Sequence, residues 1–172
     1  MSGRDLVLHH SDSSSGITLC VGAVVLRGEK VLFVRQTYGK LRGKWSLPWG
    51  FVDGIGPDGS PESPDEAAIR ETDEEAGVAA SVEGLLGIQN HGTEEGKLGL
   101  YILYLCHHVS GEPTPDNHET DRAAYFSLDE MASFDEPFDE FCAWIARRVL
   151  TNEHHVTPPT ANNPYRPHRA FL

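Results

Sequence analysis

The stretch GPDGSPESPDEAAIRETDEEAGV, residues 56–78, carries the clearest structural signals in this chain of 172 residues. Ser63, followed by Pro64 and then by Glu66, forms a capping box with proline at the first helical position, which predicts that a helix begins here. Gly77 is the expected stop, because glycine readily takes the left-handed conformation that ends many helices. The stretch therefore predicts a helix between Ser63 and Gly77, after a loop rich in glycine and proline.

Three glutamates of this helix share one face. Glu71, Glu74 and Glu75 are spaced i, i+3 and i+4, which brings their side chains together. Such a row destabilises a helix unless its charge is neutralised, and residues 62–78 hold seven acidic residues but one basic residue, Arg70. Mg²⁺ and Mn²⁺ prefer oxygen ligands, and Arg70 can hold one carboxylate through a bidentate contact. The row therefore indicates a divalent-cation site, and a solvated acidic helix face is the alternative.

Apolar and β-branched runs predict strands on both sides of this helix. The runs are Ile17–Leu26, Lys30–Gln36, Trp45–Val52, Val82–Gln89, Leu98–Cys106 and Ala123–Leu128. Apolar residues between Phe138 and Val149 recur at helical spacing, which predicts a second, amphipathic helix. This order of elements indicates an α+β fold, a sandwich around a mixed sheet.

The two ends of the chain differ from its middle. Residues 1–16 are polar and rich in Ser and His, and we expect a flexible N-terminal arm. Residues 151–172 are rich in Pro, Asn and His, and we expect a C-terminal arm that adds little to the core. The length between them fits a single domain over residues 17–150.

Charge and hydropathy exclude several classes of protein. The net charge of −12 repels a phosphate backbone, so no nucleic-acid polymer is expected as a partner. No apolar run reaches the length of a membrane span, and the start of the chain lacks a secretion signal. Three cysteines without a CxxC pair are typical of reduced thiols. We therefore expect a cytoplasmic protein that does not bind membranes.

The spacing Gly56-x5-Glu62-x7-Arg70-Glu71-x2-Glu74-Glu75-x-Gly77 resembles the signature of the Nudix hydrolase family, whose members are MutT-like. Thr72 departs from the pattern, which usually has an aliphatic residue there. The likeness extends over about residues 17–150 and includes the Trp45–Val52 segment. It implies an α/β/α sandwich with a mixed central sheet.

The resemblance also implies an activity. Nudix hydrolases use a divalent metal to cleave the diphosphate linkage of a nucleoside diphosphate attached to another moiety, or of a nucleoside triphosphate. The alternative is a Nudix-fold module that binds or senses a nucleotide without cleaving it. Such modules typically lose glutamates of the signature, and this chain retains them all.

Roles for individual residues follow from the resemblance alone. Glu71, Glu74 and Glu75 would be metal ligands with Glu62 beside them, and the cofactor would be Mg²⁺, with Mn²⁺ as an alternative ion. Arg70 would fix the geometry of the glutamates. The general base stays open among Glu71, Glu74 and Glu119, which lies on a later loop.

The glycine of the metal site is ambiguous. Family members usually carry a Leu-Pro-Gly-Gly turn that ends in the signature glycine, whereas this chain reads Leu-Pro-Trp-Gly at residues 47–50. Eleven residues separate Gly50 from Glu62, where five are expected. Gly56 keeps the formal spacing, but we expect Gly50 to be the structural equivalent and Gly56 to belong to a six-residue insertion.

Basic and aromatic residues near this turn are candidates for substrate binding. The segment from Arg35 to Lys44, ends included, has four basic residues and no acidic one, which would attract a polyphosphate. Trp49 and Phe51, like Tyr38, could stack on a base, and ordinary packing is the alternative. The expected partner is a small molecule derived from a nucleotide, and the chain could form a homodimer. Residues 92–96 lack the proline that marks ADP-ribose enzymes of the family, so a nucleoside di- or triphosphate derivative is the default substrate.

Overall fold

The computed structural model describes residues 17–52, 55–56, 59–92, 98–161 and 170–172, and the expected N-terminal arm lies outside them. The strands are β1 (Ile17–Arg27), β2 (Lys30–Gln36), β3 (Trp45–Ser46), β4 (Trp49–Phe51), β5 (Ala79–Gly92), β6 (Leu98–Ser110) and β7 (Thr120–Phe126). The helices are α1 (Pro64–Ala76), α2 (Leu128–Ser133) and α3 (Glu140–Leu150), with a 3₁₀ turn at Gly39–Leu41. None of these described helices has the length and apolar character needed to cross a membrane.

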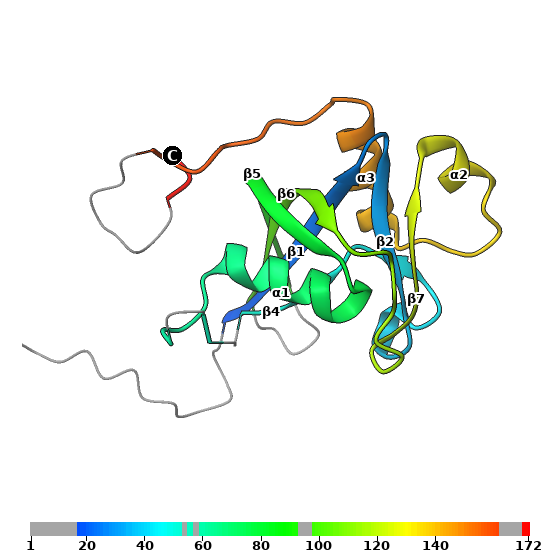
Figure 1. Ribbon diagram of the computed structural model, residues 1–172, viewed down its shortest axis with the longest axis horizontal. Helices are drawn as coiled ribbons and strands as arrows, with labels where there is room; N and C mark the ends of the chain where they lie inside the picture. The colour runs from blue at the N-terminus through cyan, green and yellow to red at the C-terminus, as the bar shows by residue number, and fades with distance from the viewer. Residues whose placement is uncertain (1–16, 53–54, 57–58, 93–97, 162–169) are drawn as a thin grey trace, which may run out of the picture.

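The described strands form one mixed sheet. Its order is β3-β2-β1-β6-β5, with β4 paired to β1 and β7 paired to β2. β1 runs parallel to β6, whereas β5 and β6 form a long antiparallel pair. β1 and β2 pair only at Leu26–Val31 and Arg27–Lys30, so the two strands diverge beyond this point. β4 pairs with the other half of β1 and thereby lies beside α1 (Figure 1).

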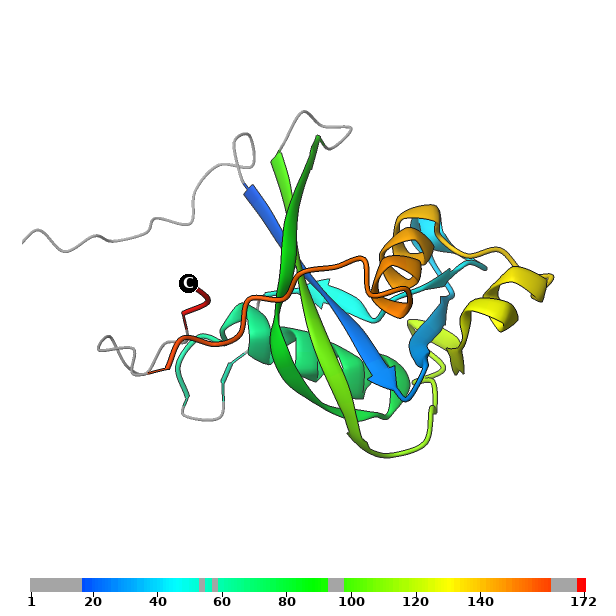
Figure 2. The same ribbon diagram turned by 90° about the horizontal axis from the view of Figure 1, so that it is seen from above.

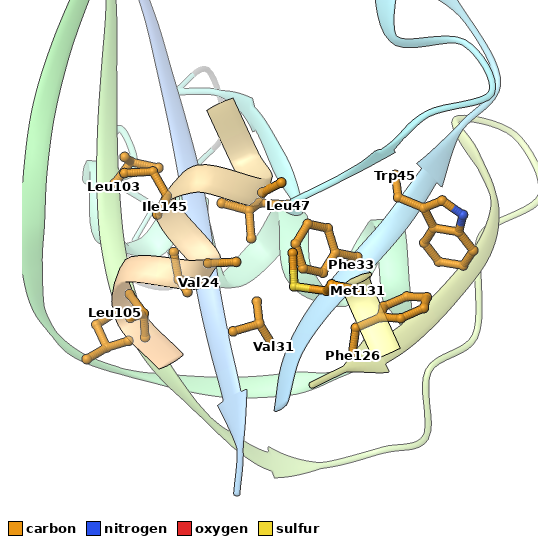
Figure 3. Close-up of a cluster of buried hydrophobic side chains, with 13 residues drawn as sticks. Val24, Val31, Phe33, Trp45, Leu47, Leu103, Leu105, Phe126, Met131 and Ile145 are labelled. Carbon is orange, nitrogen blue, oxygen red and sulfur yellow. The ribbon is translucent and has the colours of Figure 1, made fainter. Parts of the chain in front are cut away.

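Both faces of the sheet are buried. Successive side chains of a strand point to opposite faces, and in β2 Phe33 belongs to one apolar cluster while Leu32 and Val34 belong to the other. The first cluster packs under α2 and α3, where Met131 and Ile145 meet the strand residues (Figure 3). The second packs under α1. The fold is therefore the predicted α+β sandwich, with α1 on one side of the mixed sheet and α3 on the other (Figure 1).

Most predicted elements are present, and α1 has the predicted ends. The capping box of Ser63 and Glu66 is formed, and Gly77 ends the helix with a φ of 61°. The strand predicted over Trp45–Val52 is instead two short strands, because Pro48 has no N–H to donate to a continuous ladder. The strand predicted to reach Leu128 stops at Phe126, and α2 follows it.

The C-terminal arm packs on the domain more closely than its composition indicates. Thr157 forms a β-bridge with Leu85, with N···O distances of 2.8 and 2.9 Å for the two hydrogen bonds. The Phe171 ring lies 5.4 Å from the ring of Tyr104 and packs on the cluster under α1, and Val156 packs on the cluster under α3. The arm therefore crosses the strands and contributes apolar contacts, contrary to the expectation that it adds little to the core (Figure 2).

Removal of the arm after Leu150 is expected to lower the free energy of unfolding by about 2 kcal/mol, since two partly buried apolar side chains and two backbone hydrogen bonds are lost. Urea denaturation of the full chain and of the truncated chain measures this difference. Phe171→Ala in the full chain should cause about half of the loss. A truncated chain as stable as the full chain would show that the arm does not hold these contacts in solution.

Candidate active site

A hollow of about 520 Å³ opens between α1, β4 and the loop that precedes β7, and we call it the acidic pocket. Its lining consists of carboxylates, one cation and several aromatic side chains, with Gly50 and His118 completing it. They are Glu71, Glu74, Glu75, Asp116, Glu119, Arg70, Tyr38, Trp49 and Phe51. The helix face that the spacing predicts is thus the floor of a pocket rather than an open surface.

Glu75 is the most deeply buried acid of this pocket, with 2% of its surface exposed. Its carboxylate accepts hydrogen bonds from Gln36 Nε2 at 3.2 Å and from the backbone N–H of Trp49 at 3.1 Å. Burial raises the pKa of Glu75 to about 8, although both hydrogen bonds oppose the rise. Both of these donors are neutral, and no ion pair of Glu75 with a cation is found among the described residues.

Arg70 is the cation that gathers the other carboxylates. Its Nε and Nη2 donate to the two oxygens of Glu62 at 3.0 and 2.7 Å, which is a bidentate contact. Its Nη1 donates to Glu71 at 2.7 Å and to Glu74 at 2.8 Å. Burial nevertheless raises the pKa of Glu71 to about 7, because desolvation outweighs the nearby guanidinium. One arginine therefore contacts three carboxylates, where the sequence indicated a contact with one.

Gly50 lies directly against the carboxylate of Glu71. A Cβ added at Gly50 would overlap that carboxylate, so only glycine lets β4 approach α1 this closely. Gly56 instead takes part in a small turn, in which its N–H donates to the carbonyl of Ser60 at 2.8 Å. None of the described residues of the insertion lines the acidic pocket.

The donor set fits a hard divalent cation in its chemistry. Carboxylate oxygens are the ligands that Mg²⁺ and Mn²⁺ prefer, and the raised pKa values of Glu71 and Glu75 reflect negative charge that burial disfavours. Within the described residues, no three acidic, His or Cys side chains already converge as ligands, because Arg70 occupies the space among Glu62, Glu71 and Glu74. A bound cation would therefore compete with Arg70 for Glu71 and Glu74.

The predicted substrate contacts divide into two groups. Trp49 and Phe51 line the acidic pocket, with their ring centroids 6.3 Å apart. Arg35 points elsewhere: it is paired with Asp121 at 2.6 Å and with Glu136 at 3.1 Å, on the far side of β2 from Glu75. Lys44 is half-buried and lies outside the pocket lining. The structure thus brings the two aromatic residues to the site and leaves the two basic residues away from it.

A second hollow, of about 500 Å³, adjoins the acidic pocket, and we call it the apolar hollow. Most of its lining is apolar: Leu41, Leu47, Trp49, Tyr101, Leu103 and Phe141. Trp49 and Tyr38 line both hollows. The Nε1 of Trp49 is buried without a hydrogen-bond partner in the part of the chain that the structure describes.

Several residues of the site escape sequence reasoning. Gln36 holds Glu75, and the Thr120 hydroxyl donates to the backbone carbonyl of Glu75 at 2.7 Å. Asp116 accepts hydrogen bonds from three successive backbone N–H groups and so shapes the loop of Glu119. The Asp116-x-x-Glu119 spacing is a weak turn signal that could have indicated this loop, whereas nothing local marks Gln36.

The raised pKa values have a consequence for stability. The ordinary pKa of a glutamate is 4.5, and the folded chain raises the pKa of Glu71 to about 7 and that of Glu75 to about 8. Between pH 4.5 and about pH 8 in metal-free buffer, the folded chain therefore holds more protons on these two residues than the unfolded chain does. The free energy of unfolding should therefore fall as the pH rises through this window. Thermal melts from pH 5 to pH 8.5 in EDTA measure the slope, which Glu75→Gln should reduce and the exposed control Glu29→Gln should leave unchanged. An equal slope in Glu75→Gln would contradict the assignment.

The fold and the site together define an α/β/α sandwich with an acidic pocket on one helix. Comparison with known proteins gives the family. The model of the NUDIX domain matches residues 16–145. The chain therefore belongs to the NUDIX domain family, the family of the Nudix hydrolases. These enzymes act on small molecules derived from nucleotides and generally use divalent metal ions.

Similar proteins include an ADP-ribose pyrophosphatase of Methanocaldococcus jannaschii, which is 23% identical over 113 residues. That match covers 66% of this chain and 63% of the relative, so the chain spans less than two thirds of that protein. The crystal structure of a MutT NUDIX hydrolase from Burkholderia pseudomallei matches with a TM-score of 0.62 and 26% identity, over 78% of this chain and 98% of the other. The NUDIX domain of Shewanella oneidensis NrtR, complexed with ADP ribose, shares the fold with a TM-score of 0.65 at 17% identity, over 80% of this chain and 89% of that one.

Proposed function

We propose that this chain hydrolyses the diphosphate linkage of a nucleotide derivative, in a reaction that depends on Mg²⁺, with Mn²⁺ as an alternative ion. The observation that carries the proposal is the gathering of Glu62, Glu71 and Glu74 around Arg70, with the buried Glu75 in the same pocket and Gly50 leaving room for Glu71. Such a concentration of buried negative charge is costly unless a cation binds there.

The α1 carboxylates would hold the cation, with Glu71 and Glu75 as its main ligands and Glu74 and Glu62 beside them. A bound divalent ion offsets the charge of a diphosphate and acidifies an attacking water. Arg70 would keep Glu62 in place while it releases Glu71 and Glu74 to the ion. Gly50 would contribute its backbone carbonyl.

Glu119 is the general base that we favour. Glu71 and Glu74 would be occupied as ligands of the ion, whereas the carboxylate of Glu119 faces the same pocket from the opposite loop. It would take the proton of the attacking water as the water oxygen bonds to phosphorus. The anhydride P–O bond then breaks, and the leaving phosphate departs with the electron pair.

The apolar hollow would receive the organic part of the substrate. Trp49 separates it from the acidic pocket, and its ring lies 6.2 Å from that of Tyr101. A planar base in this hollow could stack on these rings. Phe51 would contact the substrate from β4. Arg35 and Lys44 would act at most on a long polyphosphate that extends beyond the pocket.

The test is a panel that includes ADP-ribose, nucleoside triphosphates and dinucleoside polyphosphates, incubated with Mg²⁺ or with EDTA and analysed by mass spectrometry. We expect products whose masses sum to one substrate and one water, with Mg²⁺ only. Residues 92–96 lack the proline that marks ADP-ribose enzymes of the family, so the panel must decide the substrate. Tight binding without cleavage would favour the alternative, a nucleotide sensor. The absence of both binding and cleavage for every member of the panel would refute the proposal. A homodimer and a cytoplasmic location stay predictions.

A further inference from the structure

Tyr38 joins the two hollows. It lies two residues after the end of β2 and directly precedes the 3₁₀ turn at Gly39–Leu41. Its side chain is about half exposed and lines both the acidic pocket and the apolar hollow. Any group that binds in the apolar hollow therefore lies beside a side chain that also reaches the acidic pocket.

The hydroxyl of Tyr38 donates a hydrogen bond to Glu119 Oε2 at 3.2 Å. Among the described residues, it is the side chain that holds this carboxylate. The neighbouring Thr37 fixes the backbone of the same loop, because its N–H donates to the carbonyl of Glu119 at 2.9 Å and its hydroxyl donates to the carbonyl of His118 at 2.7 Å. Two successive residues, Thr37 and Tyr38, thus hold the backbone and the side chain of Glu119.

Asp116 holds the other side of this loop. Its carboxylate accepts from the backbone N–H of His118, Glu119 and Thr120 at 3.1, 3.0 and 2.8 Å. The backbone of Glu119 is therefore fixed independently of Tyr38. Loss of the Tyr38 hydroxyl would free the carboxylate of Glu119 but leave its loop in place.

The carboxylate of Glu119 needs such a restraint. A glutamate has several rotatable bonds, and ordering it costs conformational entropy. The charges of Glu71 and Glu75 repel it. In turn, the charge of Glu119 helps to raise the pKa of both glutamates, although burial is the larger cause. The phenol stays protonated as a donor at neutral pH, since burial and then Glu119 raise the pKa of Tyr38 to about 12.

We propose that Tyr38 is a positioning residue that links substrate recognition to the chemical step: its ring forms part of the wall against which the organic moiety packs, and its hydroxyl holds Glu119 over the diphosphate. This inference rests on the proposed function, with Glu119 as the base. Tyr38 transfers no proton and forms no bond to the substrate.

The ring and the hydroxyl have separable effects on kinetics. Tyr38→Phe keeps the ring and should lower kcat about tenfold, with KM within twofold of the wild-type value, because a base that is less well oriented reacts less often. Tyr38→Ala should lower kcat by a similar factor and also raise KM about fivefold, because the aromatic contact is lost. Tyr125→Phe is the matched control: its hydroxyl contacts His108 at 2.9 Å, away from both hollows, and it should leave both constants unchanged.

A double-mutant cycle tests whether Tyr38 acts through Glu119. In the Glu119→Gln background, Tyr38→Phe should lower kcat by less than twofold, because the group it orients is no longer a base. The cycle uses the best substrate of the panel and saturating Mg²⁺, and thermal melts confirm that each variant is folded. Independent, multiplicative losses, or full kcat in Tyr38→Phe, would overturn the inference.

Failure of this inference is distinguishable from failure of the proposed function. An active wild-type enzyme with no kinetic coupling between Tyr38 and Glu119 overturns only the positioning role. A wild-type protein that cleaves no member of the panel refutes the hydrolase and, with it, the positioning role. A thermal-stability cycle of Tyr38→Phe with Glu119→Ala reports the hydrogen bond without any substrate, because alanine removes the acceptor, and the absence of coupling there would also contradict the contact on which the inference stands.

Discussion

Glu75→Gln is expected to lower kcat by about 10²–10⁴, the range typical of a lost charge-stabilising or base group. Glu75 is the most buried acid of the pocket, and Gln36 and the backbone of Trp49 fix its orientation. The amide is nearly isosteric, so the site keeps its shape while it loses a negative charge. Steady-state kinetics in saturating Mg²⁺ measure the loss.

The same substitution should not destabilise the metal-free protein. Burial makes the ionised form of Glu75 unfavourable, and a neutral amide removes that cost above pH 7. A thermal melt at pH 8 in EDTA should therefore show a melting temperature equal to or above that of the wild type. Glu83→Gln on β5, whose side chain pairs with His107 outside the pocket, serves as the control and should retain full activity. Wild-type turnover in Glu75→Gln would show that the ligand set is wrong.

Gly50→Ala is expected to lower kcat/KM by about 10² or more. The added methyl group would take the space of the Glu71 carboxylate, and displacement of a reacting or ligating group by about 1 Å can cost this much. The carboxylate is the end of a flexible side chain, so it can move aside without unfolding the protein. Activity should therefore fall far more than stability does.

Gly87→Ala is the matched control for this prediction. Gly87 lies on β5, and a Cβ added there meets no other group within 4 Å. It should retain activity within twofold. Kinetics and urea denaturation on both variants make the comparison. Full activity in Gly50→Ala would show that β4 does not approach Glu71 as described, and Gly56→Ala would then be the next variant to measure.

The predicted part of the site is the part with local signals. The capping box, the stop at Gly77 and the spacing of three glutamates all lie within one helix, where neighbours in sequence are neighbours in space. The same logic could have found α2, since Ser127 and Glu130 form a capping box of the same kind. That helix has six residues, too few for apolar periodicity to mark it.

The rest of the site depends on contacts between distant segments. Arg35 and Gln36 show the difference: neighbours in a strand face opposite sides of the sheet, so only one of them can reach α1. Charge favoured Arg35 as a ligand for phosphate, but Gln36 faces Glu75 while Arg35 pairs with Asp121 on β7. Which of the two faces the site depends on the register of β2 in the sheet, and that register is not a local property.

The role of the Tyr38 hydroxyl escaped for a related reason. It contributes to the pocket through Glu119, which stands 81 positions after Tyr38. The apolar hollow likewise combines β1, β6 and α3, so no contiguous stretch outlines it. The C-terminal arm has no apolar periodicity, yet single residues such as Phe171 find partners on the sheet.

The central claim is that the α1 carboxylates hold the divalent ion on which hydrolysis depends. Binding of Mn²⁺, followed by electron paramagnetic resonance in the full chain without substrate, tests it most directly. We expect the wild type and Glu83→Gln to bind Mn²⁺ with the same affinity, and Glu71→Gln and Glu75→Gln to bind it at least tenfold more weakly. Added Mg²⁺ should displace the bound Mn²⁺. Equal Mn²⁺ affinity in the wild type and in both α1 variants would contradict the claim.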